Sequence, residues 1–176
     1  NRVIDGKKIY CAGVYSKNLQ KLIRGLKYHN QRDLAYYLAK FMAEYFSKIT
    51  DKDIFEVVPV PIFPKREKKR KYNHMNLVGE EFCRLTSNTL NTSLIKRVKD
   101  DIEKETEPQY KLKRDERVKN LSNAFEVDKT NYTGKTVLLI DDICTTGSTF
   151  EEMIRELKRN GIDDIICFAA TTPFEE

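Results

Sequence analysis

The sequence predicts an α/β fold with a central parallel sheet flanked by helices, because its last third alternates between strand-like and helix-like patterns. Residues 136–140 form an apolar run with the length of a buried strand, and residues 148–159 repeat apolar side chains at helical spacing. Gly161 is placed to end that helix, and a second apolar run follows at residues 165–169. Since a strand, a helix and a strand in this order favour two parallel strands, we expect a parallel sheet.

The earlier part of the chain predicts further strands and helices. We expect strands at residues 9–15 and 55–61, and the prolines of the second suit its end or a sheet edge. We expect helices at about residues 19–26, 34–49 and 76–85, because their apolar side chains recur every three or four positions.

The charge of the chain is concentrated in one segment. The chain has 176 residues, which fits one compact domain, and its 32 Lys and Arg against 27 Asp and Glu give a net charge of +5. Residues 65–71 hold six basic residues and one acidic residue, so this segment alone accounts for the surplus. We expect a loop here. This run by itself favours a solvated lysine-rich loop, and a local field that suits a phosphate-rich ligand or nucleic acid is the alternative.

Composition also excludes or disfavours several classes of protein. The apolar runs are far shorter than the roughly 20 residues that cross a bilayer, so no membrane span is expected. The cysteines at positions 11, 83, 144 and 167 form no CxxC pair, which disfavours a zinc site and a disulfide framework. We therefore expect reduced thiols in a cytoplasmic setting and no zinc in this chain.

A long charged segment at residues 99–119 is first acidic and then basic. Loops of this length in a compact domain are usually functional lids or disordered. We expect a mobile loop that closes over a ligand, and an ordinary charged surface loop is the alternative.

The most informative stretch leads from the strand at residues 136–140 into the helix that begins near residue 148. The strand delivers two carboxylates, Asp141 and Asp142, to the edge of the sheet at which α/β proteins bind ligands. A small turn follows, and the residues expected to line it are Cys144, Thr145, Thr146, Gly147, Ser148 and Thr149. Backbone N–H groups and the positive end of a helix favour a phosphate in this turn, while the acids suit sugar hydroxyls. Together they describe a site for a ribose 5-phosphate.

This arrangement resembles the fingerprint of type I phosphoribosyltransferases, in which a strand, an acidic pair and a TTGxT turn hold phosphoribosyl pyrophosphate (PRPP). Further segments make nearly the whole chain similar to the ComF family of these proteins, and to the related amidophosphoribosyltransferase domain. The segments are VPVP at residues 58–61 with the basic stretch after it, a Q-x-x-L-x-R-x-x-R-x-x-N-x-x-N-A-F pattern at residues 109–125, and LI-x-x-LKY at residues 22–28. The chain has Arg70-Lys71-Tyr72-Asn73-His74 where the family has RGFNQ, so lysine replaces the glycine and histidine replaces the glutamine.

The resemblance implies a type I phosphoribosyltransferase fold with a small N-terminal hood at about residues 1–32 and a core at about residues 33–176. It implies that residues 145–149 hold the 5-phosphate and that Lys65 and Arg66 neutralise the pyrophosphate. Magnesium would bridge pyrophosphate and ribose oxygens of PRPP, and no protein ligand is assigned to it. The residues expected to act in catalysis are Asp141 and Asp142, which hold the ribose hydroxyls, and Arg114 and Arg117, which lie in the lid together with Gln109.

Two functions remain open at this point. The first is a magnesium-dependent enzyme that transfers 5-phosphoribosyl from PRPP to an unknown nitrogen acceptor and releases pyrophosphate. The second, implied by the ComF resemblance, is an accessory protein of DNA uptake that binds PRPP and single-stranded DNA or the uptake machinery. The candidate nucleic-acid contacts are Lys68, Lys69, Arg70, Lys71 and Tyr72. His74 could carry a proton, but a single histidine in a basic loop is more often a surface residue.

Overall fold

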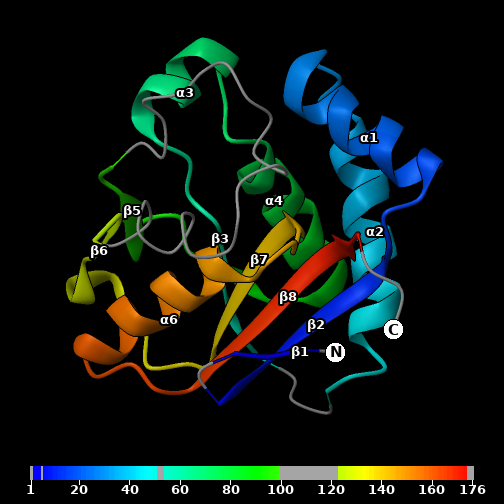
Figure 1. The fold of residues 1–176 in the computed structure, drawn as a ribbon. Coiled ribbons are helices and arrows are strands. Elements are labelled where there is room, and N and C mark those ends of the chain that lie inside the picture. The colour runs from blue at the N-terminus through cyan, green and yellow to red at the C-terminus, as the bar shows by residue number, and fades with distance from the viewer. Residues whose placement is uncertain (1, 5, 51–53, 100–122, 174–176) are drawn as a thin grey trace.

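The computed structural model describes residues 2–4, 6–50, 54–99 and 123–173 (Figure 1). The helices are α1 (Lys17–Tyr28), α2 (Leu34–Phe46), α3 (Pro64–Arg70), α4 (His74–Thr86), the short 3-10 helix η2 (Lys129–Asn131) and α6 (Ser148–Arg159). The strands are β1 (Arg2–Ile4), β2 (Lys7–Val14), β3 (Glu56–Pro59), β4 (Thr89–Leu90), β5 (Ile95–Arg97), β6 (Phe125–Val127), β7 (Val137–Ile143) and β8 (Ile165–Thr172).

The main sheet has its strands in the order β1-β2-β8-β7-β3-β4. Neighbouring strands are parallel from β2 to β4, and β1 pairs antiparallel with β2 at one edge. A separate antiparallel pair is formed by β5 and β6. The predicted α/β fold with a central parallel sheet flanked by helices is therefore confirmed.

The direction in which strands are added reverses between β3 and β7. From β3 the chain passes through α4 to β4 on one side, whereas from β7 it passes through α6 to β8 on the other side. Open α/β sheets bind ligands outside the carboxyl ends of the strands at such a point. The acid pair occupies the carboxyl end of β7, so the topology places it where a ligand is expected.

The sheet separates two hydrophobic clusters. Val137 and Leu139 of β7 pack with side chains of α6, whereas Leu138 and Ile140 face the opposite cluster, which contains side chains of α2 and α4. Phe46 lies at the centre of the second cluster, and its ring centroid is 5.3 Å from that of Phe55, 5.4 Å from that of Phe82 and 5.5 Å from that of Phe168. Both faces of β7 are thus buried over residues 137–140, as the uninterrupted apolar sequence of this part requires.

The residues expected to form the N-terminal hood divide between two locations. Strand β2 lies in the main sheet and pairs in parallel with β8, and its Ile9 is fully buried. Helix α1 lies outside the sheet and buries Ile23 and Leu26 against the cluster of α2 and α4 (Figure 1). Within this region, α1 is the element that lies outside the sheet.

The basic segment at residues 65–71 is a helix, and the expectation of a loop was wrong. Pro64 is the first residue of α3. Its fixed φ suits a helix, and no intrahelical hydrogen bond requires an N–H at this position. The Lys and Arg residues that follow have good helix propensity. Lys71 ends the helix in the left-handed conformation with φ 69°. The predicted lid at residues 99–119 lies outside the described residues except for Lys99.

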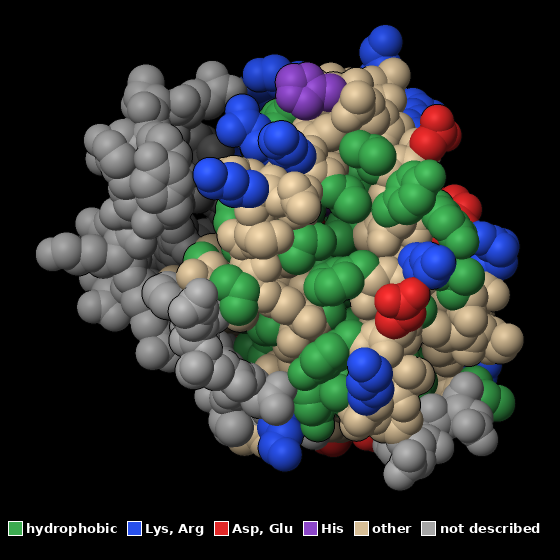
Figure 2. All heavy atoms as spheres, turned by 90° about the vertical axis from the view of Figure 1, so that its right-hand side faces the viewer, with side chains coloured by type: hydrophobic (Ala, Val, Ile, Leu, Met, Phe, Trp, Pro, Cys, Tyr) green, Lys and Arg blue, Asp and Glu red, His purple; other side chains and the backbone are tan. Residues whose placement is uncertain are grey.

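Hydrophobic side chains gather on the side of the molecule that carries α1 and α2, with Lys and Arg side chains among them (Figure 2). Tyr28, Tyr36 and Tyr37 are large exposed residues of these two helices. The guanidinium carbon of Arg70 lies 5.4 Å from the ring centroid of Tyr28, and that of Arg84 lies 5.8 Å from that of Tyr36. Two of the three exposed rings are therefore partly covered by arginine.

Helix α4 packs closely on the end of β3, which gives a test of the fold. A Cβ atom on the buried Gly79 would lie 2.8 Å from Leu90 Cδ1 and 2.9 Å from Pro59 Cγ. We expect Gly79→Val to lower the free energy of unfolding by about 1–3 kcal/mol, because the proline ring cannot rotate away. Urea unfolding of Gly79→Val and of Glu80→Val, which places the same side chain at the exposed neighbouring position, measures the difference. Equal stabilities of the two variants would contradict the packing.

Candidate phosphoribosyl site

The acid pair belongs to strand β7 itself, which continues through Ile143. Because side chains alternate along a strand, Asp142 continues the row of Leu138 and Ile140, which faces α4. Its backbone oxygen accepts a hydrogen bond from Thr171 Oγ1 at 3.0 Å, so β8 holds this part of β7 in place. Asp142 is buried, whereas Asp141 is partly buried.

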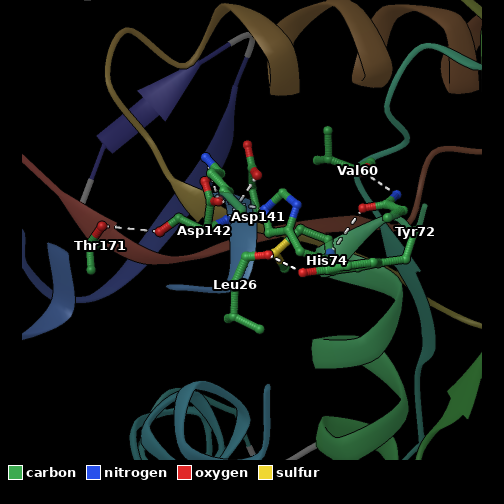
Figure 3. A network of polar contacts seen from close by, with 10 residues as sticks. Leu26, Val60, Tyr72, His74, Asp141, Asp142 and Thr171 are labelled. Atoms are coloured by element: carbon green, nitrogen blue, oxygen red, sulfur yellow. Dashed lines mark hydrogen bonds and ion pairs between the residues drawn. The ribbon is translucent and has the colours of Figure 1, made fainter. Parts of the chain in front are cut away.

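Two side chains from other elements contact the same oxygen of Asp142 (Figure 3). Lys27 Nζ of α1 lies 2.6 Å from Asp142 Oδ2, and His74 Nε2 of α4 lies 2.7 Å from it. The side chains of Asp142 and His74 are 4% and 5% exposed, and that of Lys27 is 20% exposed. The second acid is therefore part of a buried ion cluster.

His74 is buried, which corrects the expectation of a surface residue. It is the first residue of α4, and the side chain of Asn73 caps this helix by accepting a hydrogen bond from Met75 N at 2.9 Å. Asn73 Nδ2 in turn donates to the backbone oxygen of Val60 at 3.2 Å, which ties the start of α4 to the chain after β3. His74 Nδ1 is buried without a hydrogen-bond partner. Since Nε2 faces a carboxylate, the geometry assigns the ring proton to Nε2.

The cluster shifts the pKa values of the two acids in opposite directions. Burial and, after it, the adjacent charge of Asp142 raise the pKa of Asp141 to about 7 against the opposing effects of Lys27 and Arg97. Burial also opposes ionisation of Asp142, but the charge of Lys27 and the hydrogen bond from His74 hold its pKa below the usual range.

The two basic members of the cluster respond differently to their burial. Burial opposes the charge of Lys27, yet Asp142 outweighs it and raises the lysine pKa. Burial lowers the pKa of His74 and outweighs the effect of Asp142. Near neutral pH the cluster therefore contains a charged lysine, a charged Asp142 and a neutral imidazole.

The turn after β7 leads directly into α6. Gly147 is the N-cap of α6 with φ 82°, a conformation that favours glycine. Thr146 Oγ1 lies 2.8 Å from Ser148 Oγ and accepts a hydrogen bond from Ser148 N at 3.3 Å. Cys144 is buried, and its N–H donates to Thr171 O at 2.8 Å. Thr145 and Thr149 are partly buried. The predicted turn thus places hydroxyls at the amino end of a 12-residue helix, which attracts anions.

An open cavity of about 350 Å³ lies beside the carboxyl end of β3. Its lining includes Pro59, Pro61, Asn73 and Arg97, and Arg97 is close enough to lower the pKa of Asp141. Lys65 is exposed and Arg66 partly buried on α3, which begins at Pro64 on the rim of this cavity. Sequence reasoning missed Arg97, because neither its spacing nor its neighbours mark it.

Two of the candidate nucleic-acid contacts, Arg70 and Tyr72, are partly buried and contact α1. Tyr72 Oη donates to the backbone oxygen of Leu26 at 2.5 Å, and the guanidinium carbon of Arg32 lies 4.7 Å from the Tyr72 ring centroid. Arg70 stacks on Tyr28 of α1 as described above. The exposed members of the set are Lys68, Lys69 and Lys71.

The expected lid residues and the expected magnesium are the two predictions for which the described residues give no geometry. Arg114, Arg117 and Gln109 lie outside the described residues. In the part of the chain that is described, no group of three or more His, Cys, Asp or Glu could hold a metal ion. Among those same residues, no helix is long and apolar enough to cross a membrane.

Comparison with known proteins agrees with this geometry. A family profile described as a phosphoribosyl transferase domain matches residues 88–172, the part that contains the acid pair and the turn. Competence protein F of Haemophilus influenzae is 32% identical over 164 residues, which are 90% of this chain and 69% of that protein. DNA utilization protein YhgH of Escherichia coli is 26% identical over 88% of this chain and 67% of its own length. Competence protein ComFC of Bacillus subtilis is 26% identical over 84% of this chain and 56% of its own length.

The sheet order, the acid pair at the end of β7 and the turn before α6 define a protein of the phosphoribosyltransferase superfamily with the type I fold. Within that superfamily, the chain belongs to the ComF family of competence proteins. The predicted family is therefore confirmed.

The raised pKa of Asp141 predicts a pH dependence of stability. Between pH about 4 and 7 the folded protein keeps a proton at Asp141 that the unfolded chain releases, so this residue stabilises the fold less as the pH rises through that window. We expect Asp141→Asn to gain stability relative to wild type from pH 4.5 to 7.5, by an amount on the order of 1 kcal/mol per pKa unit.

Urea unfolding at four pH values across this window measures the trend. The lowered pKa of Asp142 acts below this window, because its stabilisation is lost only as the pH falls towards acid. Asp33→Asn, which removes an exposed carboxylate at the start of α2, is the control. A difference between Asp141→Asn and wild type that does not change with pH would rule out the raised pKa.

Proposed function

We propose that this protein binds PRPP with magnesium and transfers its 5-phosphoribosyl group to a nitrogen acceptor, with release of pyrophosphate. One observation carries the proposal: β7 places a carboxylate pair, and the turn at its end places amides and hydroxyls, at the point where the strand order reverses. A sugar phosphate has hydroxyls at one end and a phosphate at the other, and its two ends match these two groups.

The turn suits the 5-phosphate. The N–H groups at the start of α6 have no acceptor within the helix, and they form the positive end of its dipole. Thr146 and Ser148 add hydroxyl groups within the same turn. Gly147 keeps the backbone open to the ligand because it lacks a Cβ atom.

The acid pair and the cavity suit the rest of PRPP. Carboxylates accept hydrogen bonds from ribose hydroxyls, and Lys65, Arg66 and Arg97 supply positive charge near the end of β3 for the pyrophosphate. Magnesium enters as part of the substrate complex and offsets charge on the leaving pyrophosphate. The bond from C1 to the pyrophosphate oxygen breaks while the acceptor nitrogen bonds to C1, so positioning and electrostatics supply the catalysis.

An accessory role in DNA uptake remains the alternative, and the names of the relatives and the exposed lysines of α3 favour it. Single-strand binders combine positive charge with aromatic rings on which bases stack. The Tyr72 ring is in contact with Arg32 and its hydroxyl donates to Leu26 O, so the aromatic ring next to the basic helix is engaged within the protein. We therefore place phosphoribosyl transfer first.

Calorimetry with PRPP and magnesium tests the site. Wild type is expected to bind saturably, and Thr146→Ala to bind about tenfold more weakly, because one hydroxyl contact to a charged phosphate is worth about 1.5 kcal/mol. Thr133→Ala removes an exposed threonine before β7, at the opposite end of the strand, and should bind as wild type does. Equal affinities of the two variants would place the phosphate elsewhere.

An acceptor screen tests the transfer. Pyrophosphate release from PRPP should require one added amine or nitrogen base and should be lost in Asp141→Asn, because that variant lacks the carboxylate for the ribose. Saturable PRPP binding without release for any acceptor, together with salt-dependent binding of single-stranded DNA that survives Asp141→Asn, would favour the accessory role.

A further inference from the structure

The two carboxylates of the acid pair lie in different surroundings. Asp142 Oδ2 has contacts with Lys27 Nζ at 2.6 Å and His74 Nε2 at 2.7 Å. Asp141 is the less buried of the two, and its Oδ1 accepts a hydrogen bond from Asp142 N at 2.8 Å. We propose that Lys27 and His74 are positioning residues that hold Asp142 as a fixed, internally bonded carboxylate, which leaves Asp141 as the acid that contacts the ribose. This inference rests on the proposed PRPP site.

Lys27 supplies the compensating charge. A buried carboxylate is unfavourable without a partner, and removal of one member of a buried pair leaves the other uncompensated. The lysine reaches Asp142 because α1 is held over this end of the sheet by the hydrogen bond from Tyr72 Oη to Leu26 O and by the stacking of Arg70 on Tyr28. The position of α1 is thereby coupled to the acid pair.

His74 supplies a hydrogen bond without a second charge. Its ring is buried and its pKa is lowered, so it donates through Nε2 as a neutral imidazole. The charges of Lys27 and Asp142 then cancel, and the cluster is neutral. The negative charge that a ligand meets resides on Asp141, which faces Asp142 on β7, Lys27 on α1 and Arg97 on β5.

This arrangement makes ligand binding depend on pH through Lys27. Ionised Asp141 accepts hydrogen bonds from ribose hydroxyls better than the protonated acid does, so affinity for PRPP should rise with pH through about 7. Lys27 favours the ionised form of Asp141, and its removal should move this midpoint upward. A shift of one pH unit reduces affinity at pH 7 roughly fivefold, because the ionised fraction falls from about one half to about one eleventh.

Calorimetric titration of PRPP with magnesium between pH 6 and 9 tests this with Lys27→Met, Lys27→Arg and Lys21→Met. Lys21 is exposed on α1, so Lys21→Met is the matched control. We expect the midpoint to rise in Lys27→Met, to return in Lys27→Arg, and to stay at the wild-type value in Lys21→Met. The phosphates of PRPP titrate alike in all four proteins, so differences between variants report the protein. Identical profiles would overturn the inference and leave PRPP binding intact, whereas no binding by wild type would overturn both.

A second comparison separates the two acids. Asp141→Asn should bind PRPP at least tenfold more weakly without loss of thermal stability. Asp142→Asn should lower the melting temperature, because Lys27 then lacks its partner, and the double variant Lys27→Met with Asp142→Asn should recover stability and bind with near wild-type affinity. Equal losses of affinity in the double variant and in Asp141→Asn would show that both acids hold the ligand and would overturn the inference.

Nitrogen NMR measures which ring nitrogen of His74 carries the proton. The chain has two histidines, and the other one, His29, is exposed, so its signals serve as the reference. We expect the signals of His74 to show a proton on Nε2, to change in Lys27→Met, and to leave those of His29 unchanged. His74→Gln retains a donor at the position of Nε2 and should keep the wild-type pH profile of PRPP binding, whereas His74→Leu, which removes the donor to Asp142, should change it. A proton on Nδ1, or identical profiles for the two variants, would remove His74 from the positioning role.

Discussion

The contact of Asp142 with Lys27 and His74 joins three segments that are far apart along the chain. Burial of one carboxylate without partners would cost several kcal/mol, so the buried position of Asp142 depends on both α1 and α4. The remaining features of the site follow from this placement. Once Asp142 is fixed between them, Asp141 remains as the less buried acid beside Arg97 and the turn that begins α6.

The parallel sheet explains why these groups meet at one edge. All strands from β2 to β4 have their carboxyl ends on the same side, and helices leave β3 and β7 towards opposite faces. The start of α4, the turn before α6 and the cavity beside β3 are therefore neighbours at the switch point. Each contributes a different chemistry: a histidine held by a helix cap, a set of amides and hydroxyls, and a basic lining.

Two of the segments that carry the family resemblance contact each other where the basic helix α3 meets α1. The LKY residues of α1 contact the RKYNH residues directly, Leu26 O through Tyr72 Oη and Tyr28 through Arg70. Lys27 and His74, one from each segment, meet at Asp142 Oδ2. Both segments are thereby linked to the acid pair. Tyr72 was a candidate nucleic-acid contact because it is an aromatic residue next to a basic run. In the structure its hydroxyl bonds to Leu26 O of α1.

Local sequence patterns were sufficient to predict the unit from β7 to β8, because all of its elements follow one another directly along the chain. The order of β7, the turn, α6 and β8 could be predicted because apolar runs, Gly147 and helical spacing are short-range features, and the turn proposed for the phosphate is part of that unit. The helix α3 was missed because a run of Lys and Arg reads equally well as a solvated loop, and the burial of His74 was missed because its partner Asp142 is 68 positions away. The unequal surroundings of the two adjacent aspartates are visible only in the tertiary structure. Neighbouring residues of a strand point to opposite faces, and what each one meets there depends on how distant helices pack.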